Sequence, residues 1–160
     1  MSEATVLVAD ACLKIRRTFP ASAERLFGCF TEPAHLLRWW GPQGTTCPNA
    51  EVDLREGGNY RLEILAPSGA LSVVSGEYLE IEPPNRLVFT WRWDDTPEEQ
   101  TRVTLEFRAL AADRVELSLT HERFPDDARA DLHGEGWSSS LECLLVLLDA
   151  DDATTGGERS

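Results

Sequence analysis

The chain has 160 residues, of which 42% are hydrophobic and 27% are charged, and its formal net charge is −13 at pH 7. A length of this order favours a single domain. The acidity disfavours nucleic acids and anionic membranes as partners, because both bind proteins largely through Lys and Arg.

The cysteines are expected to act as small core hydrophobes rather than as metal ligands or a redox pair. Cys12, Cys29, Cys47 and Cys143 are scattered, and none forms a C-x-x-C pair. We therefore expect no metal and no cofactor. The start of the sequence has neither the basic nor the apolar region of a signal peptide, and the longest apolar run, 144–148, is too short to span a bilayer. These features predict a cytoplasmic protein without a membrane span.

The first part of the chain predicts one strand followed by two short helices. Residues 12–19 alternate in polarity, which is typical of a strand. Ser22 is a suitable N-cap for the first helix, and Glu24 suits its first turn. Pro33 begins the second helix, which Gly41-Pro42 ends, because proline lacks an amide N–H and glycine tolerates positive φ.

Short alternating segments separated by turn residues then predict six more strands. They are expected at 50–54, 60–64, 71–81, 87–93, 103–107 and 115–121. Their succession as a meander implies an antiparallel sheet. Gly76 is expected to mark a bulge or a bend, which leaves open which face the residues beyond it occupy.

The last predicted element is a long helix capped by Asp126 or Asp127. Its apolar residues fall on one stripe, made of His133, Trp137, Leu141, Leu144, Leu145 and Leu148. A helix whose apolar face packs on a long antiparallel sheet is an α+β architecture. We expect the domain to span residues 11–149, with residues 1–10 as an N-terminal extension and 150–160 as a disordered tail.

Several segments, in this order along the chain, are similar to one known family. They are Arg17-x-Phe19-x-Ala21, Thr31-x-Pro33-x-x-Leu36-x-x-Trp39-Trp40-Gly41-Pro42, Asp53-x-Arg55-x-Gly57-Gly58, Gly76-x-Tyr78-x-Glu80-Ile81-x-Pro83-Pro84-x-Arg86-Leu87 and Gly136-Trp137-x-x-x-Leu141. The chain resembles the START-like (SRPBCC) superfamily, in the branch named after the activator of heat-shock protein 90 ATPase. The resemblance implies a helix-grip fold: a curved seven-stranded antiparallel sheet wrapped on a long C-terminal helix, with two short helices after the first strand. It also implies a cavity between helix and sheet.

The first functional hypothesis is a module that binds a small hydrophobic or aromatic molecule in that cavity. The predicted lining, chosen for inward parity and aromatic character, comprises Trp40, Tyr60, Tyr78, Trp91, Phe107, Leu119, His121 and Trp137. Arg55 is a candidate anchor for a ligand carboxylate or phosphate. Its alternative role is to pair with Asp53 and fix the turn before Gly57-Gly58.

Two further hypotheses stay open. A cyclase- or hydrolase-type enzyme would use His121 or His133 as a base, beside Glu80 or Glu122. A co-chaperone-like or stress-response interaction protein would expose a large apolar patch on the outer face of the sheet. Homodimerisation is possible under each hypothesis. We expect a binding module rather than an enzyme.

Overall fold

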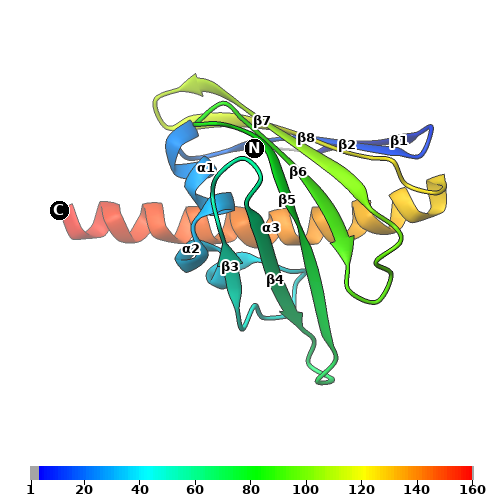
Figure 1. The fold of residues 1–160 in the computed structure, drawn as a ribbon. Helices are drawn as coiled ribbons and strands as arrows, with labels where there is room; N and C mark the ends of the chain where they lie inside the picture. The colour runs from blue at the N-terminus through cyan, green and yellow to red at the C-terminus, as the bar shows by residue number, and fades with distance from the viewer. Residues whose placement is uncertain (1–3, 160) are drawn as a thin grey trace.

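The computed structural model describes residues 4–159, and side chains over 4–150. One antiparallel sheet of eight strands has the order β1-β2-β8-β7-β6-β5-β4-β3, and a long helix, α3 (Asp127–Arg159), lies against one of its faces (Figure 1). The strands are β1 (Thr5–Ala9), β2 (Cys12–Phe19), β3 (Ala50–Val52), β4 (Asn59–Leu65), β5 (Leu71–Glu82), β6 (Arg86–Trp93), β7 (Thr101–Ala111) and β8 (Arg114–Glu122). The α+β helix-grip prediction is confirmed. No helix in the described part of the chain is both long and apolar enough to cross a membrane.

Two short helices, α1 (Ala23–Thr31) and α2 (Pro33–Trp39), connect β2 to β3 as the sequence predicted. Ser22 caps α1, since its side chain accepts a hydrogen bond from the backbone N–H of Arg25 at 3.1 Å. Pro33 occupies the first turn of α2. The backbone N–H of Trp40 makes the last helical hydrogen bond, to the carbonyl of Leu36, and the extended backbone of Trp40 then ends α2.

The core lies between α3 and the inward face of the sheet. One row crosses four strands, because Ile15 pairs with Leu119, Leu119 with Leu105, and Leu105 with Leu87. All four side chains are buried, and each contributes about 1.5–3 kcal/mol by leaving water. On α3 the predicted stripe faces this core, with Trp137, Leu141, Leu144 and Leu148 buried.

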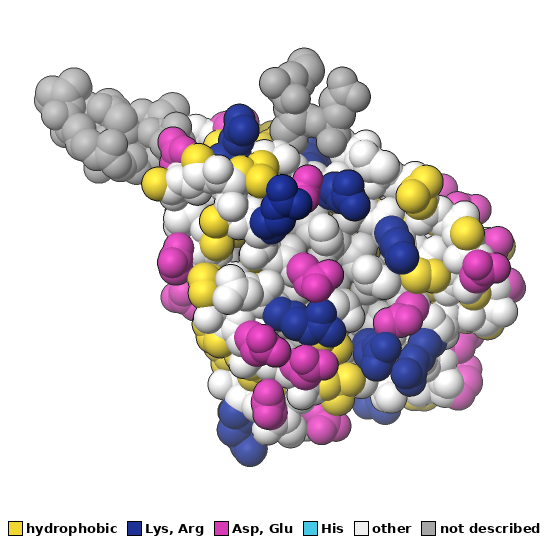
Figure 2. All heavy atoms as spheres, turned by 90° about the horizontal axis from the view of Figure 1, so that it is seen from above, with side chains coloured by type: hydrophobic (Ala, Val, Ile, Leu, Met, Phe, Trp, Pro, Cys, Tyr) yellow, Lys and Arg dark blue, Asp and Glu magenta, His cyan; other side chains and the backbone are white. Residues whose placement is uncertain are grey.

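The opposite face of the sheet is polar. Figure 2 shows this side of the molecule with Lys and Arg interspersed with Asp and Glu, and with hydrophobic side chains scattered between them. Cross-strand ion pairs account for part of the pattern, among them Arg86 with Glu106 at 3.0 Å and Arg102 with Glu122 at 3.0 Å. This alternation is typical of a sheet with one face on the core and one in solvent.

The prediction of seven strands was wrong by one, because β1 lies within the segment expected to be an extension. β1 pairs with β2 through a two-residue turn in which Asp10 and Ala11 have φ of 55° and 56°. Two positive φ values characterise a type I′ hairpin turn, which Asn-Gly or Asp-Gly normally signals. Here alanine stands at the second position, so the usual signal was missing.

The boundary at the other end also differs from the prediction. α3 is capped by Asp126, whose Oδ1 accepts from the backbone N–H of Arg129 at 2.9 Å. Its backbone stays helical to Arg159 instead of ending near Asp149. The acidic residues that indicated a tail are compatible with helical backbone, and polarity alone does not end a helix.

The irregularity expected at Gly76 lies three residues further on. The register of β5 against β6 shifts between Tyr78 and Glu80, so Leu79 is the additional residue. Gly76 has a different role, because the ring of Tyr60 packs over it and the Tyr60 hydroxyl bonds the carbonyl of Thr90 at 2.5 Å.

Gly76→Ala should therefore destabilise the protein by about 1–3 kcal/mol, the range for inserting an extra group into a well-packed core. The new Cβ would overlap the Thr90 carbonyl oxygen and lie 2.8 Å from the Tyr60 ring. Gly136→Ala is the matched control, because nothing lies within 4 Å of its Cβ position and the residue is helical. Alanine there should stabilise by about 1 kcal/mol. Denaturant unfolding measures both changes, and equal stability of Gly76→Ala and wild type would contradict the assignment.

Candidate functional site

A cavity of about 250 Å³ opens between the first turns of α3, the end of β6 and the turn after α2. It is lined by Trp40, Pro42, Trp91, Trp93, Leu132, His133, Gly136, Trp137 and Ser140. No lysine, arginine, aspartate or glutamate is among these residues. Four of these nine residues are tryptophans, so indole rings form a large part of the wall.

Three of the indoles form the inner wall of the cavity. The Trp40 and Trp137 rings meet nearly at right angles, with centroids 5.5 Å apart, and Trp91 lies 5.1 Å from Trp137. Such edge-to-face and tilted contacts add to the gain from burial. Trp39 turns to the other side, where it packs on Phe30 and donates its N–H to the carbonyl of Cys29 at 2.9 Å.

The rim of the cavity is the turn that follows Trp40. Gly41 has φ of 111°, a conformation that a side chain rarely adopts, and a Cβ there would collide with Thr45. The backbone N–H of Gln43 donates to Ser139 Oγ on α3 at 2.8 Å. This hydrogen bond fixes the turn against the helix at the edge of the cavity.

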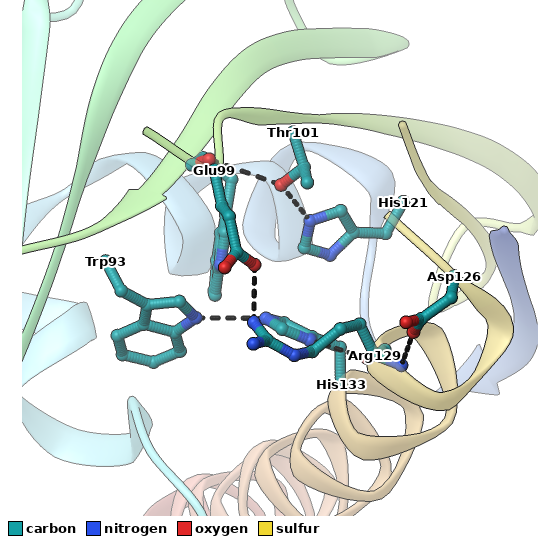
Figure 3. Close-up of polar contacts among 8 residues, drawn as sticks. Trp93, Glu99, Thr101, His121, Asp126, Arg129 and His133 are labelled. Atoms are coloured by element: carbon teal, nitrogen blue, oxygen red, sulfur yellow. Dashed lines mark hydrogen bonds and ion pairs between the residues drawn. The ribbon is translucent and has the colours of Figure 1, made fainter. Parts of the chain in front are cut away.

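His121 lies behind this wall, fully buried on β8, and both of its ring nitrogens are occupied. Trp137 Nε1 donates to His121 Nδ1 at 3.0 Å, so this nitrogen carries no proton. Nε2 therefore carries it and donates to Thr101 Oγ1 at 2.7 Å, and the hydroxyl in turn donates to the carbonyl of Trp91 at 3.2 Å. Figure 3 shows part of this series of hydrogen bonds, from the imidazole of His121 to Thr101.

His133, on the cavity wall, has the same arrangement with the nitrogens exchanged. Trp93 Nε1 donates to His133 Nε2 at 2.9 Å, and Nδ1–H donates to the carbonyl of Arg129 at 2.8 Å (Figure 3). The guanidinium of Arg129 pairs with Glu99 and stays out of the cavity lining. Each histidine thus accepts an indole N–H with its one lone pair.

Both imidazoles are held neutral. Burial lowers the pKa of His121 well below its usual range, and the neighbouring His133 lowers it further. Burial also lowers the pKa of His133, although its bond to the Arg129 carbonyl and the charge of Glu99 oppose this. Protonation of either ring would place its new N–H against an indole N–H.

The acid–base pairing proposed from the sequence does not form. Glu80 pairs with Arg86, and Glu122 pairs with Arg102. No carboxylate of the described residues bonds His121 or His133. The prediction was wrong because strand parity identified which residues face inward but not which of them meet.

The structure distributes the predicted lining residues over three places. Trp40, Trp91, Trp137 and the candidate base His133 line the cavity. Tyr60 and Tyr78 lie with Trp40 around a separate void of about 20 Å³, too small for more than a water molecule. Phe107 packs on Phe27, and Leu119 is buried in the row described above.

Arg55 is not part of the cavity. Its side chain is 70% exposed, and its Nε bonds Asp53 Oδ2 at 2.9 Å, which is the turn-fixing role considered as the alternative. Gly58 is hemmed in by the backbone of Asp53 and Arg55, so the motif builds a compact turn.

Besides Pro42, four lining residues were not predicted from the sequence: Trp93, Leu132, Gly136 and Ser140. Trp93 follows Trp91 by two residues and so shares its face of β6. His133, Gly136, Trp137 and Ser140 follow one helical face at i, i+3, i+4 and i+7. Leu132 is adjacent to this face and is 62% exposed at the cavity mouth.

The cysteines form no disulfide. Cys12, Cys29, Cys47 and Cys143 are free; Cys29 and Cys47 are buried, and the other two are partly buried. Burial raises the pKa of the Cys47 thiol, which favours the unreactive thiol form.

Comparison with known proteins identifies the family. Residues 20–149 match the family described as "Activator of Hsp90 ATPase homolog 1-like protein". The chain belongs to this family, a branch of the START-like proteins with the helix-grip fold. No match was found among curated proteins.

Solved structures of this family are similar over nearly their whole length. A Chromobacterium violaceum protein is 32% identical with a TM-score of 0.78, covering 86% of this chain and 97% of its own. The AHSA1 protein of Silicibacter pomeroyi is 31% identical with a TM-score of 0.79, covering 88% and 99%. A Plasmodium falciparum protein described as an HSP90 activator is 28% identical with a TM-score of 0.70, covering 87% and 96%.

Because His121 is neutral in the folded protein, the free energy of unfolding should decrease as the pH is lowered. The pKa of His121 is lower in the folded chain than in the unfolded chain, so the unfolded chain binds more protons below about pH 6.5. The free energy of unfolding therefore decreases as the pH falls. A histidine that stays neutral in the folded state lowers the free energy of unfolding by about 1.3 kcal/mol between pH 7.0 and pH 5.5. His121→Gln should reduce this slope, because Gln keeps a donor and an acceptor but does not titrate. Denaturant unfolding at both pH values measures the slope.

The control for this experiment is His35→Gln, at a partly exposed position on α2. It measures how much of the slope comes from a histidine outside the buried cluster. A His121→Gln variant that folds at pH 7.0 and keeps the full wild-type slope would contradict the assignment of a buried neutral imidazole.

Proposed function

We propose that this protein binds a small, largely apolar or aromatic molecule in the cavity between α3 and β6. The observation that carries the proposal is a 250 Å³ cavity with four indole rings and no Lys, Arg, Asp or Glu in its lining. Ligand sites of this kind are concave, mostly apolar and provided with few polar groups. The two hydrogen-bonded imidazoles behind and beside the rings support a preformed wall.

The free energy of binding in this cavity should favour an apolar ligand. Transfer of apolar surface out of water contributes about 25 cal/mol per Å², and rings that already hold their positions lose little conformational entropy on binding. Trp137 and Trp93 are each fixed by a hydrogen bond to a histidine. These two rings are therefore in position before a ligand arrives.

Binding is a better fit to this site than catalysis. A general base needs a free lone pair close to the substrate, and the lone pairs of His121 and His133 both accept indole N–H groups. Thr101, the remaining polar partner, is buried and bonded on both sides. The cavity offers shape and apolar contact rather than proton transfer.

A protein-interaction function is the second candidate, because one relative is described as an HSP90 activator. Such a role would draw on an exposed apolar patch. The face in Figure 2 instead mixes charges of both signs with scattered hydrophobic side chains. The ligand-binding proposal accounts for the indole-lined cavity, which an interaction role alone does not require.

The neutral dye N-phenyl-1-naphthylamine tests the proposal. We expect saturable 1:1 binding with enhanced dye fluorescence. Gly136→Leu should weaken binding by about tenfold or more, which corresponds to about 1.4 kcal/mol or more, because the new side chain enters open space in the cavity.

Glu135→Leu is the matched control. It adds the same side chain one position earlier on α3, at an exposed residue outside the lining, and should bind the dye as wild type does. Absence of saturable binding, or equal binding by Gly136→Leu and wild type, would refute the cavity as the site.

A further inference from the structure

Three polar groups of the cavity wall make no hydrogen bond to any other described residue. The indole nitrogens of Trp40 and Trp91 are buried donors without a partner. Ser140 also lines the cavity, and its hydroxyl forms no hydrogen bond within the described part of the chain. The other three indoles bond internally: Trp39 to Cys29, Trp93 to His133 and Trp137 to His121.

The contrast within one cluster is informative. Buried polar groups are nearly always paired, and each exception calls for an explanation such as an unseen partner. Here the chain pairs every indole except two, and these two line the same cavity and lie next to each other, with ring centroids 5.8 Å apart. A partner that is not part of the chain would complete the set.

We infer that the ligand is a neutral, largely apolar compound carrying a hydrogen-bond acceptor oxygen, of the class of ketones, quinones or lactones. The inference rests on the binding function proposed above and specifies its ligand. Trp40 and Trp91 would donate to the acceptor, and the Ser140 hydroxyl would donate to it or to a second oxygen.

The charge of the surroundings argues for a neutral molecule. No cationic residue lines the cavity to balance a carboxylate or a phosphate, and the net charge of −13 opposes the entry of anions. A quaternary ammonium could be held by indole faces. It would accept no hydrogen bond, however, and would leave both indole donors unpaired.

Binding requires a small movement of the rings. In the structure neither unpaired indole nitrogen is reachable by solvent. Because no hydrogen bond holds either N–H in place, we expect a turn of each ring to bring its N–H edge toward the cavity when the ligand binds. The ketone should thus change the environment of these two N–H groups, whereas a hydrocarbon of the same shape should not give them a partner.

The test compares 9-fluorenone with fluorene, which differ by a carbonyl in place of a methylene. In protein labelled with ¹⁵N at the tryptophan indoles, 9-fluorenone should move the N–H proton resonances of Trp40 and Trp91 downfield, as hydrogen bonding does. Fluorene should move them less, and the bonded N–H of Trp39 should respond alike to both compounds. Trp40→Phe and Trp91→Phe assign the two resonances.

Affinity gives a second, independent readout. Displacement of N-phenyl-1-naphthylamine yields the ratio of 9-fluorenone affinity to fluorene affinity for each variant. Trp40→Phe and Trp91→Phe should each lower this ratio by about threefold to tenfold, the value of one hydrogen bond, because the single carbonyl oxygen of 9-fluorenone has two lone pairs for the two indole donors. Trp39→Phe and Ser138→Ala, at a bonded indole and at a serine outside the lining, should keep the wild-type ratio.

The outcomes separate the two proposals. If both compounds bind but the ratio is the same in all variants and the indole resonances respond alike, the acceptor inference is overturned and the binding function stands. Displacement of the dye by tetramethylammonium but not by 9-fluorenone would overturn it in favour of a cationic ligand. If neither the dye nor either compound binds, the binding function fails and the inference fails with it.

Discussion

The structure depends on how one helix fills the concave face of an eight-stranded sheet. Toward the middle of α3 aliphatic side chains such as Leu141 and Leu144 fill the space, and they bring no polar atoms with them. Near the start of α3 the gap is filled by large rings, His133 and Trp137, packed on the indoles of β6 and of the α2 end. Rings fill volume efficiently but carry N–H groups that need partners in a low-dielectric interior. The hydrogen bonds from indole to imidazole meet that need for Trp93 and Trp137, and the cavity lies where the filling is incomplete.

Most of the fold could be predicted from the sequence, because its hydrophobic periodicity is regular. The alternation over β2, β4 and β8 and the stripe of α3 each matched the observed element, and Ser22 and Pro33 marked the beginnings of α1 and α2. The departures have local physical causes. β1 was not predicted because Asp10-Ala11 forms a turn that normally uses glycine, and the bulge at Leu79 carries no glycine either. Gly76, where the sequence predicted a bulge or bend, is needed for close packing against Thr90 and Tyr60.

The site could be predicted only in part, because parity and spacing identify inward-facing residues but not their mutual distances. Trp40, Trp91 and Trp137 were recognised as lining residues, and the structure brings them together from three separate elements. Tyr60 and Tyr78 face inward too, yet they lie at the other side of the Trp40 ring, around a nearly filled void. The hydrogen-bond partners could not be predicted from the sequence. No sequence pattern indicates that Trp93 donates to His133, which lies 40 positions further along the chain.

The pairing of indole with imidazole also bears on what this site can do. An imidazole that accepts an indole N–H gives up the lone pair on which proton transfer depends, so the same bond that fixes the ring removes it from acid–base chemistry. It also opposes protonation, because an imidazolium would turn an N–H toward the indole donor and would lie in an environment that burial already makes unfavourable for charge. The cavity wall therefore keeps its charge state and its shape across the neutral pH range. Under the binding function proposed above, such a site would distinguish molecules by shape and by the few donors left unpaired, which are the indoles of Trp40 and Trp91 and the hydroxyl of Ser140.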